Sequence, residues 1–280
     1  MPSHIHIVCR PSEPRKELIA KKVRKESNEL AILKRLNTIQ PRSEHIISLL
    51  DSFHGQSGPW VILPRMDSVM DYIAISPKQF ESKVTQVCWG LIKGLAYLHE
   101  LRIAHRDIKP DNLVVDEDFC LKIIDFDIAI QLKDEDEEVN NECGTKYWMA
   151  PEVVKKPTMY SPIRADRWSC GRVLLYLLDV FKTGDEQLRA IGRKLKAHHP
   201  NQRPSLRAWH SWVSVPLLGM RNIERKASQP RQALMEVNGQ DMTVPNAKKQ
   251  RLTALDDNDL VGQSPALYEP QASLPVARVR

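Results

Sequence analysis

The order of hydrophobic and polar positions divides the chain into a beginning rich in predicted strands and a longer helical part. Apolar and polar residues alternate over residues 5–9 and again over residues 18–23, which predicts two short strands joined by a turn. Residues 45–53 and 60–63 are two further apolar runs with the composition of strands. We therefore expect residues 1–66 to form a small, sheet-rich unit.

Helical spacing dominates the part that follows, apart from one early helix. Leucines recur at every third position over residues 28–37, which predicts a helix, and the serine directly before them can cap it. Residues 80–100 carry a longer amphipathic pattern and are predicted to form a second helix. Residues 113–124 read as a β-hairpin that turns at three acidic residues, and residues 166–178 as another helix. Residues 67–218 are therefore expected to form a mainly helical unit.

The periodic pattern ends before the chain does. Residues 219–280 are rich in Gln, Asn, Pro, Ser and charged residues and show no sustained apolar spacing, so a disordered tail is predicted. Within it, residues 245–252 resemble a short nuclear-import signal. A solvated basic run is the alternative for a cluster of this size.

Composition narrows the class of protein. Of the 280 residues, 42% are hydrophobic and 27% are charged, the balance of a soluble globular protein with an ordinary core. The formal net charge of +6 is modest, so solubility is its plainest role and direct binding to nucleic acid is not expected. The five cysteines lack metal-ligand spacing, no signal sequence is apparent, and no apolar run reaches the roughly 18 residues of a membrane span. We expect an intracellular protein, in the cytoplasm, the nucleus or both, without contact to a membrane.

Residues 105–112 read H-R-D-I-K-P-D-N and carry the candidate chemistry. The octapeptide resembles the catalytic loop of the eukaryotic protein kinases, and its lysine resembles the serine/threonine type. The resemblance implies that Asp107 orients the hydroxyl that accepts the phosphate, that Lys109 lies near the γ-phosphate, and that Asn112 binds Mg²⁺. It also implies that Arg106 pairs with a phosphate in relatives that phosphorylate their activation segment. A polar surface turn that happens to contain these residues is the alternative.

Two later motifs extend the resemblance. The triplet 125–127 reads D-F-D and follows the predicted hairpin, where the family has D-F-G. Asp125 is therefore implied as the second Mg²⁺ ligand, and a strand-end aspartate that caps backbone groups is the alternative. Residues 144–152 resemble the segment that ends in A-P-E, which implies that Thr145 forms hydrogen bonds near Asp107 and Lys109.

Four further positions follow from the same resemblance. Asp127 replaces the glycine of D-F-G, which is expected to make inversion of the Asp-Phe unit harder. Asp166 is implied to cap the backbone of the catalytic loop. Glu152 is implied to form a buried ion pair with Arg203. The interval from Asp166 to Arg203 is shorter than the family's, so the helices between them are expected to be abbreviated.

The beginning of the chain matches the family less well. Residues 19–22 resemble the V-A-I-K strand, which implies that Lys22 holds the α- and β-phosphates and that Glu29 is its partner. A lysine-rich strand edge and an exposed helical glutamate are the alternatives. Met66, between the two predicted units, and Leu113, after the catalytic loop, are the further residues expected to contact the nucleotide.

Glycine is missing where the family uses it. No glycine occurs before Gly55, so the G-x-G-x-x-G loop that covers the phosphates is absent from this stretch. Lys22 and Glu29 are also close together in the sequence, which predicts a shortened helix around the glutamate. We expect either that nucleotide binding is weakened or altered, or that the chain is an incomplete version of a longer protein.

Together these resemblances imply an α+β fold with two lobes, the protein kinase-like fold, in which ATP and Mg²⁺ bind in the cleft. Residues 1–66 would be an incomplete small lobe and residues 67–218 the large lobe. The expected function is transfer of the γ-phosphate to serine or threonine hydroxyls of protein substrates. A kinase-fold scaffold that binds nucleotide weakly is the alternative, and transfer to a small molecule is disfavoured because residues 144–152 resemble a peptide-docking segment. The oligomeric state is left open.

One acidic run suggests how the activation segment is ordered. No Ser, Thr or Tyr lies between Asp127 and Gly144, so phosphorylation within this stretch is excluded. Residues 134–138 are instead five consecutive carboxylates. We hypothesise that one or two of them reach Arg106 and hold the segment open. A solvated acidic loop tip is the alternative.

Overall fold

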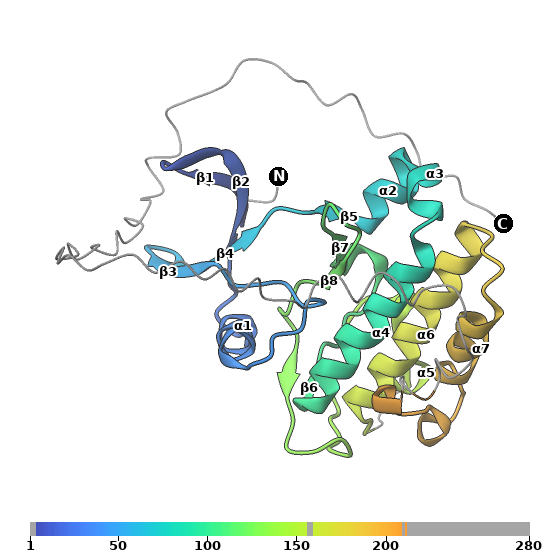
Figure 1. Ribbon diagram of the computed structural model, residues 1–280. Coiled ribbons are helices and arrows are strands. Elements are labelled where there is room, and N and C mark those ends of the chain that lie inside the picture. Colours follow the sequence, from blue (N-terminus) through green and yellow to red (C-terminus); the bar gives the residue numbers. More distant parts are fainter. Residues whose placement is uncertain (1–3, 156–158, 209–210, 212–280) are drawn as a thin grey trace, which may run out of the picture.

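The computed structural model describes residues 4–155, 159–208 and 211 of the chain (Figure 1). The predicted disordered tail, with its basic cluster, lies outside the described residues.

Four antiparallel strands form the sheet of the small lobe. They are β1 (Ile5–Arg10), β2 (Glu13–Lys22), β3 (Asp51–Gly55) and β4 (Gly58–Pro64). Their order is β1-β2-β4-β3, so β2 and β4 are central, and helix α1 (Glu29–Thr38) lies below the sheet in Figure 1. The early strand pair, the strand at residues 60–63 and the first helix are confirmed. The predicted strand over residues 45–53 is only partly formed, because β3 begins at Asp51.

The alternation of side chains along β2 decides which residues face the large lobe. Leu18 and Ala20 are buried on one face, where they pack with Trp60 and Ile62 of β4. Ile19 lies on the opposite face and packs against the main hydrophobic core. Since successive residues of a strand point to opposite faces, the lysine two positions after Ile19 also faces inward.

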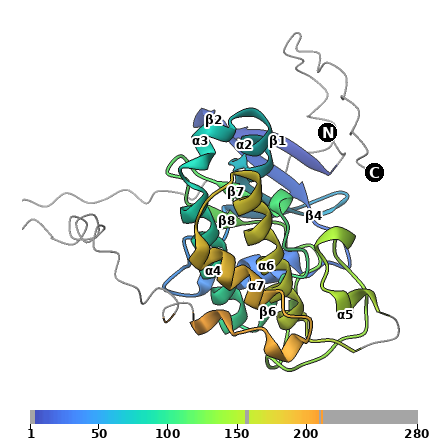
Figure 2. The ribbon, with the colours of Figure 1, turned by 90° about the vertical axis from the view of Figure 1, so that its right-hand side faces the viewer.

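Helices build most of the large lobe, and the two longest, α4 and α6, lie side by side in both ribbon views (Figures 1 and 2). The α-helices are α2 (Val69–Ile75), α3 (Pro77–Glu81), α4 (Val84–Glu100), α5 (Pro151–Val154), α6 (Pro162–Val180) and α7 (Glu186–Leu195). Single 3₁₀ turns occur at Pro110–Asn112, Lys146–Trp148, Pro200–Gln202 and Leu206–Ala208. The predicted helix over residues 80–100 is interrupted after Glu81, and its main part is α4.

The apolar stripe of α4 forms the centre of the core. The stripe residues are fully buried; they are Val84, Val87, Leu91, Leu95 and Leu98. Burial of each such side chain stabilises the fold by about 1.5–3 kcal/mol relative to exposure. Small strands complete the large lobe: β5 (Asp67–Ser68), β7 (Leu113–Val115) and β8 (Leu121–Ile123) form one sheet, and β6 (Ile103–Ala104) pairs with β9 (Ile130–Gln131). The predicted hairpin is confirmed as β7 and β8.

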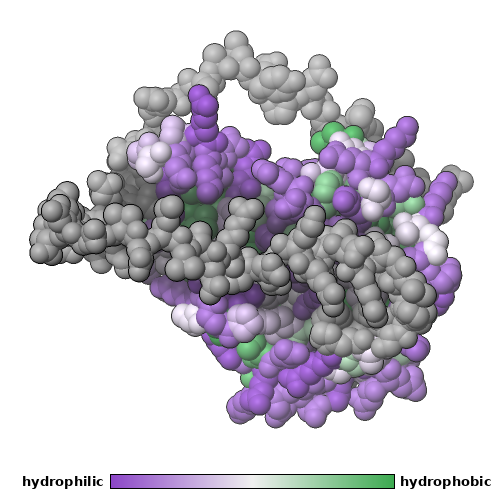
Figure 3. Space-filling view, viewed as in Figure 1, coloured by the Kyte–Doolittle hydropathy of each residue, from purple (hydrophilic) through white to green (hydrophobic). Residues whose placement is uncertain are grey.

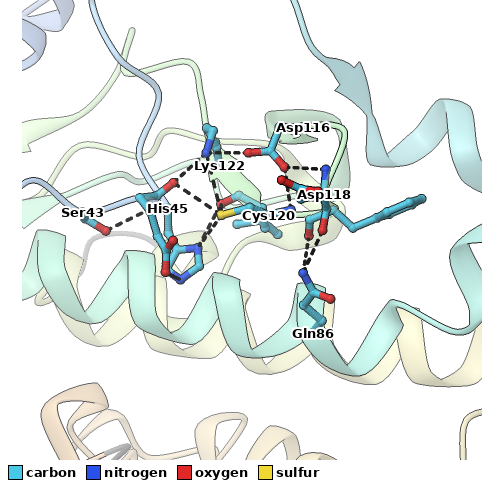
Figure 4. Close-up of polar contacts among 10 residues, drawn as sticks. Ser43, His45, Gln86, Asp116, Asp118, Cys120 and Lys122 are labelled. Carbon is cyan, nitrogen blue, oxygen red and sulfur yellow. Dashed lines mark hydrogen bonds and ion pairs between the residues drawn. The ribbon is translucent and has the colours of Figure 1, made fainter. Parts of the chain in front are cut away.

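The segment before β3 is attached to β8 of the large lobe, as Figure 4 shows. The N–H of Ile123 donates to the carbonyl of His45 at 2.9 Å, and the His45 ring meets the carbonyl of Leu121 at 3.1 Å. Burial lowers the pKa of His45, so the neutral ring donates from Nδ1 to that carbonyl. The ammonium of Lys122 donates to the carbonyl of Glu44 at 2.9 Å. These bonds attach the segment between α1 and β3 to the large lobe.

The surface is mainly polar. Hydrophilic side chains cover most of the described surface seen in Figure 3, with apolar residues scattered between them. Among the described residues, no helix combines the length and apolar character required to cross a bilayer.

Candidate active site

The loop over residues 105–112 lies between β6 and β7, and α6 binds its backbone through Asp166. Asp166, which is 1% exposed, accepts the backbone N–H of His105 at 2.7 Å and that of Arg106 at 2.8 Å. The same carboxylate contacts Nε2 of His99 at 3.3 Å. Arg106 has a φ of 70°, a left-handed conformation that costs free energy for a residue with a Cβ. The two N–H bonds offset that cost, and the prediction that Asp166 caps this backbone is confirmed.

Asp107 lies at the centre of a polar network. Thr145 donates to it twice, from its backbone N at 3.0 Å and from its hydroxyl at 2.8 Å. Lys109 lies 2.8 Å from the second carboxylate oxygen and also donates to the Thr145 hydroxyl at 2.7 Å. The amide of Asn112 donates to the Asp107 carboxylate at 3.1 Å and to its carbonyl at 2.9 Å. The structure thus brings together four residues that the sequence singled out.

A glycine allows the activation segment to approach this network. Gly144 has a φ of +103°, and a Cβ there would lie 2.6 Å from the carbonyl oxygen of Arg106. Any other residue would therefore push the segment away from the loop. Gly144 directly precedes Thr145, so this close contact places the threonine against Asp107.

A partly buried ion-pair cluster lies on the small-lobe side of the cleft. The ammonium of Lys21 is 2.7 Å from Glu29 and 2.6 Å from Asp125. Glu29 is 1% exposed and also accepts the backbone N–H of Phe126 at 3.3 Å. Burial alone would lower the pKa of Lys21, but the two carboxylates raise it. Burial alone would raise the pKa of Asp125, but Lys21 holds it below its ordinary value.

The expected pairing of Lys22 with Glu29 is wrong, because Lys21 makes that contact. The two lysines are neighbours on β2 and so point to opposite faces of the sheet. Lys21 shares the inner face with Ile19, whereas Lys22 lies at the strand end opposite Trp60. The motif V-A-I-K resembles residues 18–21 as well as residues 19–22, and because residues 18–20 are all apolar the sequence does not decide between them. The burial of Leu18 and Ala20 in the structure decides it.

A pocket of about 290 Å³ lies next to Lys21 and Asp125. Met66 lines it, as the sequence predicted for a residue between the lobes. Its other apolar walls come from Ile5, Ile19, Ile47, Leu63, Val114 and Ile124. The expectation that Leu113 contacts a nucleotide is wrong: its side chain is fully buried in the main core, and the next residue along β7, Val114, lines the pocket.

The same pocket contains the candidate Mg²⁺ ligands. Asn112 and Asp125 both line it and present an amide and a carboxylate oxygen, the hard ligands that Mg²⁺ prefers. The amide nitrogen of Asn112 donates to Asp107, which leaves the amide oxygen for a cation. Asp125 carries two oxygens, and Lys21 contacts one of them. This donor set fits one or two Mg²⁺ ions.

The segment after Asp125 is fixed to the small lobe. Asp127 forms an ion pair with Arg24 at 2.7 Å, and its carbonyl accepts the hydroxyl of Ser27 at 2.8 Å. That hydroxyl in turn accepts the N–H of Glu29 at 3.0 Å. The N-cap position itself is Asn28, which makes no side-chain capping bond, so Ser27 binds the first turn of α1 from one residue farther back than predicted. The expectation that Asp127 hinders inversion of the Asp-Phe unit stays a prediction.

The hypothesis that the acidic run reaches Arg106 is wrong. The guanidinium of Arg106 donates to the carbonyl of Asn141 at 3.4 Å. Within the run, Glu135 forms an ion pair with Arg167 and Asp136 pairs with Arg164 at 2.5 Å, both arginines belonging to α6.

The pair between Glu135 and Arg167 is the stronger of the two, because Arg167 is buried. It is 3% exposed, and Glu135 is its one carboxylate partner among the described residues. Burial alone would raise the pKa of Glu135, but Arg167 holds it below the ordinary value. The hydroxyl of Ser161 also donates to the Glu135 carbonyl at 2.9 Å. The acidic run is therefore attached to α6.

The ion pair between Glu152 and Arg203 is confirmed. The two side chains meet at 2.8 Å, and Arg203 is 2% exposed. Arg203 also donates to the carbonyl of Arg164 at 2.9 Å, which ties the end of the activation segment to α6.

Comparisons with known proteins agree with this geometry. The family model described as "Protein kinase domain" matches residues 11–236. The serine/threonine-protein kinase CLA4 of Candida albicans is 33% identical over 172 residues, which cover 60% of this chain and 16% of the relative. STE20 of Debaryomyces hansenii is 31% identical over 168 residues, covering 60% and 14%, and ste20 of Aspergillus fumigatus is 31% identical over 169 residues, covering 60% and 19%. The chain thus matches less than a fifth of the length of these relatives.

Proposed function

Because the chain belongs to the protein kinase domain family, we propose that it is an ATP- and Mg²⁺-dependent kinase that phosphorylates serine or threonine hydroxyls of protein substrates. One observation carries the proposal: Asp107, Lys109, Asn112 and Thr145 form one hydrogen-bonded network, and Asn112 connects this network to a pocket that Asp125 also lines. A protein that only binds partners has no chemical need for this combination.

Each residue of the network has a task that follows from its position. ATP bound with Mg²⁺ supplies the γ-phosphorus that the acceptor hydroxyl attacks, with ADP as the leaving group. Asp107 accepts a hydrogen bond from the hydroxyl and orients its oxygen, and the proton leaves through this carboxylate. Lys109 places positive charge beside the transferred group. Asn112 and Asp125 would hold the metal, and Lys21 the phosphates nearer to the nucleoside.

The choice of serine and threonine is supported by Lys109. Its ammonium bridges Asp107 and Thr145 and so fills the space beside the catalytic carboxylate. The relatives that share this segment are named serine/threonine-protein kinases, which agrees with the proposal.

A second candidate function is a kinase-fold scaffold that binds nucleotide weakly. The absence of glycine before Gly55 favours it, because a backbone loop that approaches phosphate closely needs glycine. The two functions differ in whether phosphate is transferred. A kinase needs the carboxylate of Asp107 for the transfer, whereas a scaffold does not.

The test compares Asp107→Asn with the parent protein. Transfer of radiolabelled phosphate from ATP to a generic basic protein is expected to fall at least a thousandfold, because the amide cannot accept the proton. The melting temperature should change little, since the amide that replaces the carboxylate keeps one oxygen for Thr145. Asp118→Asn, the same change in an exposed turn, is the matched control and should keep full activity. Equal transfer by the Asp107→Asn variant and the parent would overturn the kinase proposal.

A further inference from the structure

A separate group of polar side chains lies where the segment before β3 meets β8, away from the nucleotide pocket (Figure 4). Glu44 and His45 belong to that segment, and Cys120 directly precedes β8. One ligand atom from each residue, a carboxylate oxygen, a ring nitrogen and the sulfur, lies within 4.8 Å of the other two. In the part of the chain that the structure describes, this is the one place where three side chains of metal-binding type converge in this way.

His45 is the buried member of the group. It packs closely against α4, since a Cβ at Gly94 would lie 2.9 Å from the Cβ of His45. Nδ1 of the ring donates to the carbonyl of Leu121 at 3.1 Å, which leaves the lone pair of the neutral ring on Nε2. That nitrogen is buried and has no hydrogen-bond partner among the described residues. A buried lone pair without a partner costs free energy, which a bound cation would recover.

The group that faces this lone pair cannot supply a hydrogen. Oε1 of Glu44 lies 3.5 Å from Nε2 of His45, and a carboxylate oxygen and an unprotonated ring nitrogen are both acceptors. Two ligands of a tetrahedral Zn²⁺ ion are about 3.5 Å apart, because each bond is about 2.0–2.2 Å long. The spacing of the two acceptors therefore suits one metal ion between them.

Cys120 offers the third ligand. Its sulfur lies 3.7 Å from Nδ1 of the histidine, and its contacts with the carbonyls of Glu44 and Leu121 are 3.8 and 4.0 Å long. Such long contacts are weak, so a rotation about the Cα–Cβ bond that turns the sulfur toward Nε2 costs little. The ammonium of Lys122, which Asp116 holds at 3.1 Å, lies 3.7 Å from the sulfur. It favours the thiolate, the form of cysteine that binds metal.

We propose that Glu44, His45 and Cys120 bind one Zn²⁺ ion through a carboxylate oxygen, Nε2 and Sγ. A thiolate together with an imidazole and a carboxylate is a donor set for Zn²⁺, whereas Mg²⁺ prefers oxygen ligands. Three protein ligands leave the fourth position of the ion for water, and Glu44 and His45 line a cavity of about 620 Å³ that admits it. The thiol releases its proton to solvent when the ion binds.

The ion connects the two lobes. Glu44 and His45 lie between α1 and β3 of the small lobe, and Cys120 lies between β7 and β8 of the large lobe. A metal that binds the folded protein and not the unfolded chain raises its stability. The role of this site is therefore structural, and it goes beyond the proposed kinase activity.

The first experiment titrates the full chain with Co²⁺, which occupies zinc sites and gives an intense near-ultraviolet band when it is bound to a thiolate. The parent should show this band, and added Zn²⁺ should remove it. Cys120→Ser should abolish the band, and Glu44→Gln should weaken Co²⁺ binding at least about tenfold, because each residue supplies one of three protein bonds. Cys9→Ser, the same change at an exposed cysteine outside the group, is the matched control and should keep the band and the affinity.

The second experiment measures the melting temperature with and without Zn²⁺. Zn²⁺ should raise it in the parent and in Cys9→Ser, and leave it unchanged in Cys120→Ser and Glu44→Gln. The side chain of Glu44 is 72% exposed, so Glu44→Gln keeps the fold and its lost response reports the ligand alone.

Three results would overturn the inference: no thiolate band in the parent, the same band in Cys120→Ser, or unchanged Co²⁺ affinity in Glu44→Gln. None of the readouts involves ATP or phosphate transfer. Failure of the zinc site therefore leaves the kinase proposal standing, and failure of the kinase proposal leaves the zinc site standing.

Discussion

The two sides of the cleft hold their polar groups in different ways. On the large-lobe side, Asp107 has hydrogen bonds or ion pairs from three neighbouring residues, all between 2.8 and 3.1 Å. On the small-lobe side, a single cation, Lys21, is shared between two carboxylates, and the nearby Lys22 and Lys25 have no fixed partner within the described residues.

The difference separates two properties of an enzyme. Groups that are already fixed lower the barrier of the chemical step, because they need no rearrangement when charge develops. Groups that must still be ordered lose conformational freedom when the ligand binds, which weakens binding. We therefore expect a site with a competent transfer step and a modest affinity for ATP.

The largest expected effect comes from removing Lys21, the cation that Glu29 and Asp125 share. Lys21→Met should reduce phosphate transfer at least a hundredfold, because it leaves Glu29 buried without its partner and frees Asp125. Lys22→Met should leave phosphate transfer nearly unchanged, because Lys22 lies on the opposite face of β2. Steady-state kinetics of both variants, with Lys16→Met as the control, measure the contrast. Equal losses of phosphate transfer in the Lys21→Met and Lys22→Met variants would contradict the assignment of Lys21 to the cleft.

A smaller effect is expected from the contact that orders the activation segment on the large-lobe side. Glu135→Gln leaves the buried Arg167 without its charge partner and should lower the free energy of unfolding by roughly 1–3 kcal/mol. Arg167→Met should cost less, since Glu135 is partly exposed and can turn to solvent. Urea unfolding and peptide phosphorylation are the measurements.

The same contact predicts a response to phosphatase. Because the acidic run holds the segment without phosphate, treatment of the parent with a phosphatase should leave its activity unchanged. A strong loss on treatment would contradict this role of Glu135, and so would full activity and stability in Glu135→Gln.

The smallest expected effect is a pH dependence of stability. The folded-state pKa of Asp125 lies below its ordinary value, so its pair with Lys21 contributes stability above pH 3.8 that is lost as the pH falls through the lowered value. Parent and Asp125→Asn should therefore differ by a constant amount between about pH 5 and 8 and converge below about pH 4. Thermal melting of both proteins across this pH range tests the prediction. A stability difference between parent and variant that grows toward acid pH would contradict it.

The large lobe could be predicted closely from the sequence, because its signals extend over many residues. The apolar stripe of α4 repeats along the length of the helix, and H-R-D-I-K-P-D-N fixes the position of each residue within a short loop. Gly144 and Thr145 are adjacent in the sequence and act at the same place. A prediction from such a long pattern stays correct even when the end of the element is misplaced by one residue.

The two wrong site assignments share a cause. Both Lys22 and Leu113 lie one position away from the residue that lines the cleft, Lys21 on β2 and Val114 on β7. A shift of one residue in a strand exchanges its two faces, so an error that would be harmless in a helix cap moves a side chain from the cleft to the opposite face. The partners of the acidic run could not be predicted either, because Glu135 and Arg167 are 32 residues apart and nothing local connects them.

Asp166 and Arg167 are consecutive residues of α6, and one holds the catalytic loop while the other holds the activation segment. The two loops therefore depend on the same turn of one helix, and loss of that turn would loosen both. In terms of local unfolding, they form a single cooperative unit: a fluctuation that frays the beginning of α6 releases both the residues that orient the acceptor hydroxyl and the surface that would receive the substrate. A partner that stabilises this turn would act on both loops at once, without contact to either.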